Sequence, residues 1–264
     1  MRLRDLQAAR AEGRRVAMLT CYDHTSAVHL QQAGVEMLLV GDSAAGVILG
    51  HDRTTGVTLP FLIQLAAAVR RGAHNSHVMA DMPFGSYHGS RGRAVRNVCK
   101  VVAETGCDSV KMEVSRRQLE LVAECADAGV AVCAHLGLRP QHVQRTGYSV
   151  QAKTRAEAEQ LAEDAAAFEA AGAAMVLIEA VPPQAAQMVV EATTLPVIGC
   201  GAGSAPMGHV VVLQDLLGLT PRRPKFVPDL GQPSLRQAAE TWVQMVRDGS
   251  YPEAEHVYEG EFDA

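Results

Sequence analysis

Short apolar runs that end at a charged or polar residue recur along this chain and predict a parallel β-sheet. Both faces of a parallel sheet are covered by helices, so its strands are apolar throughout instead of alternating. The runs also have the length of strands and lie between turn residues. Eight such strands are expected, over residues 16–19, 37–40, 77–80, 109–112, 130–134, 175–178, 196–198 and 209–213.

Segments with the 3.6-residue spacing of amphipathic helices separate these runs. We expect helices over residues 25–33, 59–71, 94–104, 117–128, 156–171 and 184–192. This alternation is typical of βα units wound around a parallel sheet. Eight strands with short connections favour a closed (β/α)8 TIM barrel of the α/β class, for which about 250 residues are ordinary. An open, doubly wound sheet is the structural alternative.

The two ends of the chain differ from the repeating part. A charged helix is expected over the first 15 residues, MRLRDLQAARAEGRR, and a last helix over 234–247. The proline-rich stretch 221–228 cannot continue a helix and is expected to be extended, and the acidic tail 251–264 to be poorly ordered. We therefore predict a single barrel domain over 1–264, with an N-terminal helix and a C-terminal extension.

Composition and charge narrow the class of protein. Of the 264 residues, 48% are hydrophobic but only 4% aromatic, so the core is built from Ala, Val and Leu. The net charge of −5 and the lack of a basic stripe argue against nucleic-acid binding. No run of 18 apolar residues appears, so we expect no membrane association and a cytoplasmic location. Six scattered cysteines without a CxxC pair are expected to be reduced and mostly buried.

Ionisable side chains stand at or just beyond the ends of four predicted strands. In a barrel these strand ends converge on one mouth, and barrel enzymes have their active sites there. Three carboxylates beside a lysine indicate a site for a hard divalent cation, and one further carboxylate is a candidate general base. The residues concerned are Asp42 with Ser43, Asp81, Lys111 with Glu113, and Glu179.

Seven motifs around these positions carry a resemblance to a known family. They are VGDS at 40–43, GHD at 50–52, ADMPF at 80–84, VKME at 110–113, AHLGLRPQ at 134–141, IEAVP at 178–182 and IGCGAG at 198–203. In this order and spacing they resemble the ketopantoate hydroxymethyltransferase family, over roughly residues 10–255.

The resemblance implies a fold, a reaction and partners. The family is a (β/α)8 barrel that uses Mg²⁺ and forms large homo-oligomers, commonly decamers. It transfers a hydroxymethyl group from 5,10-methylenetetrahydrofolate to a small 2-oxo acid, 3-methyl-2-oxobutanoate, and so makes 2-dehydropantoate for pantothenate biosynthesis. The expected partners are this acid, the folate and other copies of the chain.

The resemblance also implies roles for single residues. Asp42 and Asp81 match metal-binding positions that also contact the substrate, and Glu113 matches a third metal-associated carboxylate. Substrate contacts further map to Ser43 and Lys111. The catalytic positions are Glu179, which matches the general base, and His135, which matches a histidine near the substrate.

Elementary chemistry agrees with these roles. A 2-oxo acid can chelate Mg²⁺ through its carboxylate and keto oxygens, and the cation then stabilises the enolate formed when a C3 proton leaves. Glu179 can take that proton only if its pKa stays low enough for ionisation near pH 7. The enolate carbon would then attack the one-carbon unit of the folate.

Simpler interpretations stay open for several residues. Asp42 can be a helix N-cap, Lys111 and Glu113 can form a plain ion pair because they share strand parity, and His135 can be a hydrogen-bonded core histidine. A barrel that has lost catalysis and survives as a structural oligomer is a further alternative.

Some positions depart from the family pattern. Arg139, the turn 146–148 (Thr-Gly-Tyr) and the stretch Met207-Gly208-His209 replace the usual residues and are expected around the mouth. These departures leave open a paralogue that makes or breaks C–C bonds in another 2-oxo acid, as the wider phosphoenolpyruvate-mutase and isocitrate-lyase group does.

Overall fold

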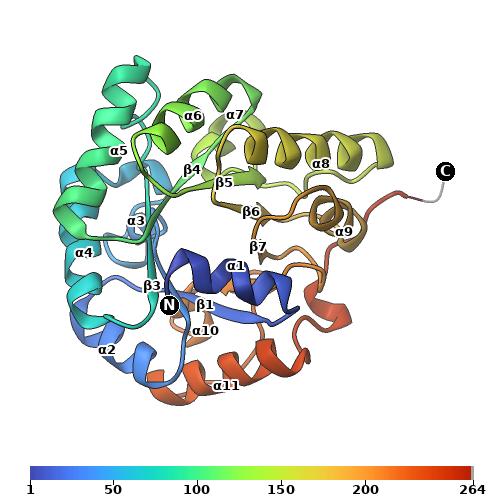
Figure 1. Ribbon diagram of the computed structural model, residues 1–264. Coiled ribbons are helices and arrows are strands. Elements are labelled where there is room, and N and C mark those ends of the chain that lie inside the picture. The colour runs from blue at the N-terminus through green and yellow to red at the C-terminus, as the bar shows by residue number, and fades with distance from the viewer. Residues whose placement is uncertain (263–264) are drawn as a thin grey trace.

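Eight parallel strands form a closed barrel at the centre of the molecule (Figure 1). The computed structural model describes residues 1–262, apart from the side chain of Thr146. Each strand pairs with the next in sequence, and the last pairs with the first, which confirms the barrel and excludes the open sheet. The strands are β1 Val16–Thr20, β2 Met37–Val40, β3 His77–Asp81, β4 Ser109–Glu113, β5 Val132–Gly137, β6 Met175–Glu179, β7 Val197–Cys200 and β8 Gly208–Val211.

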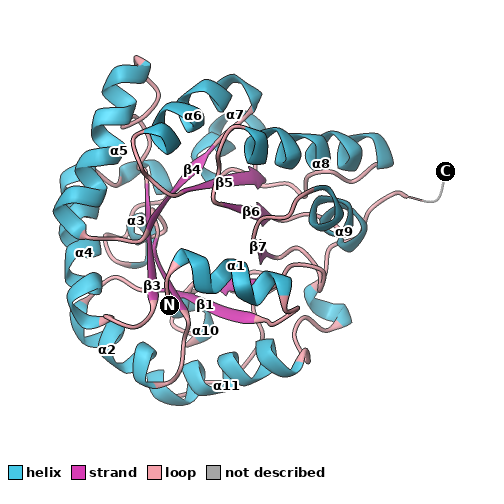
Figure 2. Cartoon of the chain, in the orientation of Figure 1, coloured by secondary structure: helices cyan, strands magenta, loops and turns pink. Residues whose placement is uncertain are grey.

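Helices surround this barrel as an outer layer (Figure 2). Within residues 1–262, no helix is long and apolar enough to cross a membrane. The α-helices are α1 Leu3–Ala11, α2 His24–Gln32, α3 Ala44–Val47, α4 Leu59–Gly72, α5 Arg91–Thr105, α6 Leu119–Asp127, α7 Val143–Thr146, α8 Arg155–Ala170, α9 Pro183–Ala192, α10 Leu213–Leu216 and α11 Leu235–Asp248; the short 3-10 helices are η1 Thr54–Gly56, η2 Arg116–Gln118, η3 Pro140–His142 and η4 Ala254–His256.

Alternate residues of each strand face the two sides of the barrel wall, as the period of a strand requires. On β1, Val16 and Met18 belong to the cluster inside the barrel, whereas Ala17 and Leu19 pack against the outer helices. Both sets are fully buried, which explains why the strands read as unbroken apolar runs.

Helix α1 covers the N-terminal end of the barrel. Its buried Leu6 and Ala9 join the interior cluster. Arg10 Nη2 donates a hydrogen bond of 2.7 Å to the carbonyl of Val190 in α9, which fixes α1 across the opening. A ligand of the barrel interior must therefore enter from the opposite, C-terminal end.

Ionisable side chains become more frequent in the barrel interior toward its C-terminal end. Along β3 the inward positions change from His77 through Met79 to Asp81, and on β4 Lys111 and Glu113 share the inward parity. The parallel register places Asp81 beside Lys111 and Glu113 beside His135. Charged groups from strands far apart in sequence therefore meet in one layer.

Three strand predictions miss an observed bound by two residues or more, and one of them is the seventh strand, which runs over Val197–Cys200 instead of 196–198. The fifth strand runs over Val132–Gly137 instead of 130–134, because pairing with β6 extends as far as Glu179 and carries the strand forward. The eighth is Gly208–Val211 and stops before the predicted residue 213, where Leu213 begins α10.

The prediction of a poorly ordered tail is wrong for residues 251–262; residues 263 and 264 lie outside the described part. Tyr251 is fully buried against Trp242, with ring centroids 4.7 Å apart, and its hydroxyl donates to the Phe226 carbonyl at 2.7 Å. Further along, Glu261 N donates to the Lys153 carbonyl at 2.7 Å. Aromatic side chains hold this acidic segment against the barrel. The prediction considered only the charge of the segment and therefore missed their contribution.

Candidate active site

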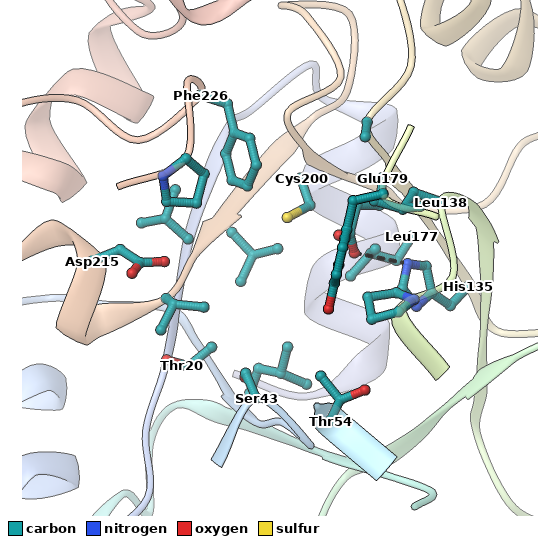
Figure 3. Close-up of a pocket in the computed structure, with 18 of the residues that line it drawn as sticks. Thr20, Ser43, Thr54, His135, Leu138, Leu177, Glu179, Cys200, Asp215 and Phe226 are labelled. Atoms are coloured by element: carbon teal, nitrogen blue, oxygen red, sulfur yellow. Dashed lines mark ion pairs between the residues drawn. The ribbon is translucent and has the colours of Figure 1, made fainter. Parts of the chain in front are cut away.

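A cavity of about 430 Å³ opens at the C-terminal ends of the strands. Figure 3 shows His135 and Glu179 on one side, with Phe226 and Asp215 across from them. Of the residues predicted from the sequence, those that line it are Asp42, Ser43, Lys111, His135 and Glu179.

Asp81 lies buried directly beneath this lining. Its Oδ1 is 2.7 Å from Lys111 Nζ, and its Oδ2 accepts a hydrogen bond of 2.9 Å from the backbone N–H of Asp42. Gly41 permits this approach, because a Cβ there would lie 2.8 Å from Ser43 Oγ and 3.4 Å from Asp81 Oδ2. The structure thus brings Asp42, Asp81 and Lys111 together.

Glu113 is buried away from the cavity lining. Both of its carboxylate oxygens accept the backbone N–H of Gln141, each at 3.1 Å. Burial raises the pKa of Glu113 to about 9, although Lys111 opposes the rise. In the described part of the chain, no group of three or more His, Cys, Asp or Glu residues is arranged to hold a metal ion. The three predicted carboxylates therefore do not converge on one point.

A chain of contacts links Lys111, His135 and Glu179. Lys111 Nζ lies 3.3 Å from His135 Nδ1, and His135 Nε2 lies 3.1 Å from Glu179 Oε2. Burial holds the pKa of His135 well below its usual range, so the ring is neutral. An ammonium only donates, so Nδ1 accepts and the ring proton sits on Nε2. Nε2 faces Glu179 off the hydrogen-bonding direction and has no partner.

Glu179 carries a carboxylate suited to exchange a proton near neutral pH. Its side chain is 18% exposed. Burial raises its pKa to about 7, while the charge of Lys111 works in the opposite direction. The requirement that Glu179 stay ionised near pH 7 is therefore met in part, because its pKa lies close to that pH.

The backbone around Glu179 is tightly constrained. Gly137 on the neighbouring strand has φ +80°, and a Cβ there would lie 2.5 Å from the carbonyl oxygen of Glu179. Ala180 has φ +49°, an unfavourable conformation for a residue with a side chain. Its N–H donates to the Cys200 carbonyl at 2.9 Å, which helps hold that conformation.

The site holds more negative than positive charge. Four carboxylates, those of Asp42, Asp81, Glu113 and Glu179, share one buried ammonium. Burial and the charge of Asp81 raise the pKa of Asp42. Burial alone would lower the pKa of Lys111, but Asp81, Asp42 and Glu113 raise it. This surplus of oxygen ligands fits a divalent cation, and Mg²⁺ commonly takes only one or two protein carboxylates.

Two of the simpler interpretations are not supported. The N-cap of α3 is Ser43, whereas the Asp42 carboxylate accepts a hydrogen bond from Gln141 instead. Lys111 pairs with Asp81 and not with Glu113.

Sequence reasoning missed several residues of the site. Gln141 stands in the motif at 134–141, but its residue type suggested no role. Tyr22 donates or accepts a hydrogen bond of 2.8 Å with Ser43 Oγ, and no pattern in the sequence marks it. Phe226 and Tyr258 line the cavity from the proline-rich stretch and the tail. The only available signal for these two was their aromatic character in polar segments.

Of the three family departures expected around the mouth, only the stretch Met207 to His209 lies elsewhere, and its predicted place is wrong. Met207 to His209 stand at the start of β8, the end of the barrel opposite the mouth, where Met207 O accepts from Val16 N at 2.9 Å. Arg139 Nη1 donates to the Val114 carbonyl at 3.2 Å and does not line the cavity. From the turn 146–148, Tyr148 does line it.

Cys200 lines the cavity beside Glu179. Burial raises its pKa well above the ordinary value, so it stays a thiol and is a poor nucleophile. All six cysteines are free, and four of them are buried, as expected.

Comparison with known proteins shows the same family over almost the whole chain. The family model described as ketopantoate hydroxymethyltransferase matches residues 1–254. The 3-methyl-2-oxobutanoate hydroxymethyltransferase of Alkalilimnicola ehrlichii is 42% identical over 260 residues, which are 97% of this chain and 94% of that protein. That of Heliobacterium modesticaldum is 43% identical over 251 residues, or 94% and 91% of the two chains.

Solved structures show a likeness of fold alone. A phosphoenolpyruvate phosphomutase from Streptomyces platensis superposes with a TM-score of 0.64 at 16% identity, over 94% of this chain and 88% of that one. A phosphonopyruvate hydrolase gives the same TM-score at 14% identity, over 97% and 90%. At such identities the shared barrel does not indicate a shared reaction.

Proposed function

The chain belongs to the ketopantoate hydroxymethyltransferase family and is an enzyme of that class, and from this premise we propose its substrates and mechanism. It transfers a hydroxymethyl group from 5,10-methylenetetrahydrofolate to 3-methyl-2-oxobutanoate and yields 2-dehydropantoate. The observation that carries this proposal is the Glu179 carboxylate, which faces the cavity with a pKa of about 7 beside the neutral His135.

Asp42 and Asp81 are the residues that would hold Mg²⁺. The backbone N–H of Asp42 donates to the carboxylate of Asp81 at 2.9 Å, so the two residues already lie together. The surplus of carboxylates at the site also favours a cation. A bound Mg²⁺ would polarise the carbonyl of a 2-oxo acid and make the neighbouring C–H more acidic. Glu113 is not proposed as a ligand, because both of its oxygens accept from Gln141 N and its raised pKa favours the uncharged form near pH 7.

Lys111 and Ser43 position the acid. The ammonium of Lys111 is held by Asp81 at 2.7 Å and lines the cavity, where it can attract the carboxylate of a 2-oxo acid. The hydroxyl of Ser43 is oriented by Tyr22 at 2.8 Å and can donate to an oxygen of the same substrate.

Glu179 takes the C3 proton of the acid. Its carboxylate lies on the cavity wall, and a base with a pKa near the working pH combines adequate ionisation with adequate basicity. The Nε2–H of His135 stays 3.1 Å from Glu179 Oε2 and can donate a hydrogen bond to it when the substrate binds. His135 thereby orients the base and does not replace it, because its pKa lies well below the usual range and the neutral ring is a weak base.

The choice of 3-methyl-2-oxobutanoate over another 2-oxo acid is supported by where the departures lie. Arg139 and the stretch from Met207 to His209 do not line the cavity, so they do not contact an acid bound there. Tyr148 is exposed at the mouth. A change at the mouth affects how the larger folate enters more than how the small acid binds. The interpretation as a paralogue with another 2-oxo acid therefore loses its main support.

Assembly into homo-oligomers, up to decamers, and a cytoplasmic location are part of the proposal. They rest on membership of the family alone.

The test follows the C3 proton and the new bond separately. The purified protein with Mg²⁺ and 3-methyl-2-oxobutanoate in D₂O, without folate, should exchange the C3 proton by NMR. Addition of 5,10-methylenetetrahydrofolate should then yield 2-dehydropantoate. Other small 2-oxo acids serve as controls, and one used more than about tenfold better in kcat/KM would contradict the assigned acceptor.

A further inference from the structure

Gln141 contacts more of the buried site than any single predicted residue does. It lies in η3, directly after β5, and is 5% exposed. Its side-chain Nε2 donates to Asp42 Oδ2 at 2.9 Å and to the Met82 carbonyl at 3.0 Å. Its Oε1 accepts from the hydroxyl of Tyr87 at 2.9 Å.

These partners determine the orientation of the amide. Nε2 faces two acceptors, a carboxylate and a carbonyl, so the nitrogen must occupy that side. Exchange of the nitrogen and oxygen would place three oxygens against one another and would leave Tyr87 opposite a donor. The Tyr87 hydroxyl also reaches the Glu113 carbonyl at 3.3 Å, which ties it to β4.

The backbone of Gln141 performs a second task. Its N–H binds both oxygens of Glu113 at 3.1 Å each. One residue thus connects Asp42 after β2, Met82 after β3 and Glu113 at the end of β4. Asp42, one of the two carboxylates proposed to hold the cation, is thus tied to β3 and β4 through an uncharged group.

The lack of charge distinguishes Gln141 from the alternative partners. A lysine or arginine in its place would also bind the carboxylate of Asp42, but it would neutralise the charge that attracts a cation. An amide fixes the rotation of that carboxylate and leaves its charge intact. Because Asp42 also lines the cavity, its carboxylate is presented to a ligand in one orientation.

We propose that Gln141 is a positioning residue, which orients Asp42 for a divalent cation without touching the substrate. This inference rests on the proposed function only in assuming that a cation binds beside Asp42 and Asp81. Groups that orient metal ligands typically change metal affinity by about 10- to 100-fold when they are removed.

The experiment measures binding of Mn²⁺ to the full-length protein by electron paramagnetic resonance, without substrate. Gln141→Met keeps the length of the side chain and removes its hydrogen bonds, and it should raise the Kd for Mn²⁺ by about 10- to 100-fold. Excess Mn²⁺ should restore most of the C3 proton exchange. The matched control, Gln184→Met on the exposed surface of α9, should bind Mn²⁺ as the parent does.

Tyr87→Phe provides a milder variant, should Gln141→Met fail to fold. It removes only the hydroxyl that anchors Oε1, and it should weaken Mn²⁺ binding in the same direction. A Kd within twofold of the parent in the folded Gln141 variant, or in Tyr87→Phe if that is the one that folds, overturns the role of Gln141. Failure of the parent itself to bind Mn²⁺ overturns the proposed cation site, and the role of Gln141 with it.

Discussion

At the scale of single residues, the chemistry of this site follows from burial of charge. Glu179, Asp42 and Glu113 all have raised pKa values because burial removes water from each of them, and neighbouring carboxylates add to the rise at Asp42 and Glu113. The surroundings of Lys111, in contrast, favour the charged form of its side chain. The site therefore stores unfavourable electrostatic energy that a cation and an anionic substrate can relieve together.

The role of Glu179 is tested by Glu179→Gln. The amide keeps the shape of the side chain but cannot accept the proton, so C3 exchange should slow by on the order of 100-fold or more while the 2-oxo acid still binds. Deuterium exchange by NMR and binding of the acid by calorimetry measure the two effects. Exchange at the parental rate would give the role to another group, with His135 the next candidate.

The pKa of Glu179, about 7, also predicts two pH dependences. The base form increases as pH rises, so the rate of C3 exchange in the parent should increase through pH 7 and then level off. Stability should change in the opposite sense. The folded pKa lies above the ordinary 4.5, so the folded state binds the extra proton and loses stability as pH rises between these values.

Glu179→Gln removes this loss of stability, because the amide does not titrate. At pH 8 the variant without ligands should be more stable than the parent by about 1–3 kcal/mol, and at pH 4 the difference should largely disappear. Urea unfolding at the two pH values measures it. An equal difference at both pH values would show that ionisation of Glu179 does not destabilise the folded state.

Asp81 and Asp42 should differ in what their removal does to the apo protein. Asp81→Ala leaves the buried ammonium of Lys111 without its partner at 2.7 Å, and should cost about 3–5 kcal/mol. Asp42→Ala removes a carboxylate whose pKa is already raised, and leaves Gln141 Nε2 with the Met82 carbonyl, so it should stay within about 1 kcal/mol of the parent. Chemical denaturation without metal compares them; equal losses would contradict this account of the ion pair.

At the scale of elements, the register of the strands decides which groups meet. Gly137 on β5 stands opposite Glu179 on β6, and Glu113 on β4 stands opposite His135. A shift by one residue would turn each of these side chains to the other face of the wall. The loop that follows β5 then returns Gln141 to the ends of β2 and β4.

The tight crossing at Gly137 is open to a direct test. Gly137 and Gly129 both have left-handed φ values, +80° and +84°, but only at Gly137 would a Cβ meet another backbone, 2.5 Å from Glu179 O. Gly129→Ala should therefore cost about 1–2 kcal/mol from conformation alone. Gly137→Ala should cost about 4 kcal/mol or more, since backbone must also move. Thermal unfolding compares the pair, and similar losses would show that β6 adjusts freely.

At the scale of the whole molecule, the two ends of the chain complete the barrel in different ways. Helix α1 closes the N-terminal opening with Leu6 and Ala9. The tail after α11 returns to the mouth, where Tyr251 is buried and Tyr258 lines the cavity. One end thus adds to the core, and the other adds both to the core and to the site.

The two tail tyrosines should separate these contributions. Tyr251→Ala removes a ring that packs 4.7 Å from Trp242 and should cost about 3–5 kcal/mol. Tyr258→Ala removes a half-buried ring beside Phe226 and should lower stability by only about 1 kcal/mol. Because this ring lines the cavity, its loss should also raise the KM for at least one of the two substrates. Unfolding and steady-state kinetics distinguish them. A parental KM in Tyr258→Ala would place the tail outside the working site.

The sequence by itself determined the barrel and five of the lining residues. A buried parallel strand requires an unbroken apolar run, and the mouth of the barrel lies where these runs end. Asp42, Ser43, Lys111, His135 and Glu179 all reach the cavity as predicted. Only the tertiary structure decided that Glu113 faces Gln141, that Met207 lies at the far end, and that the acidic tail is packed. These three features depend on strand register, on the path of the loops and on aromatic packing. All of these involve residues far apart in the sequence, so local residue patterns do not predict them.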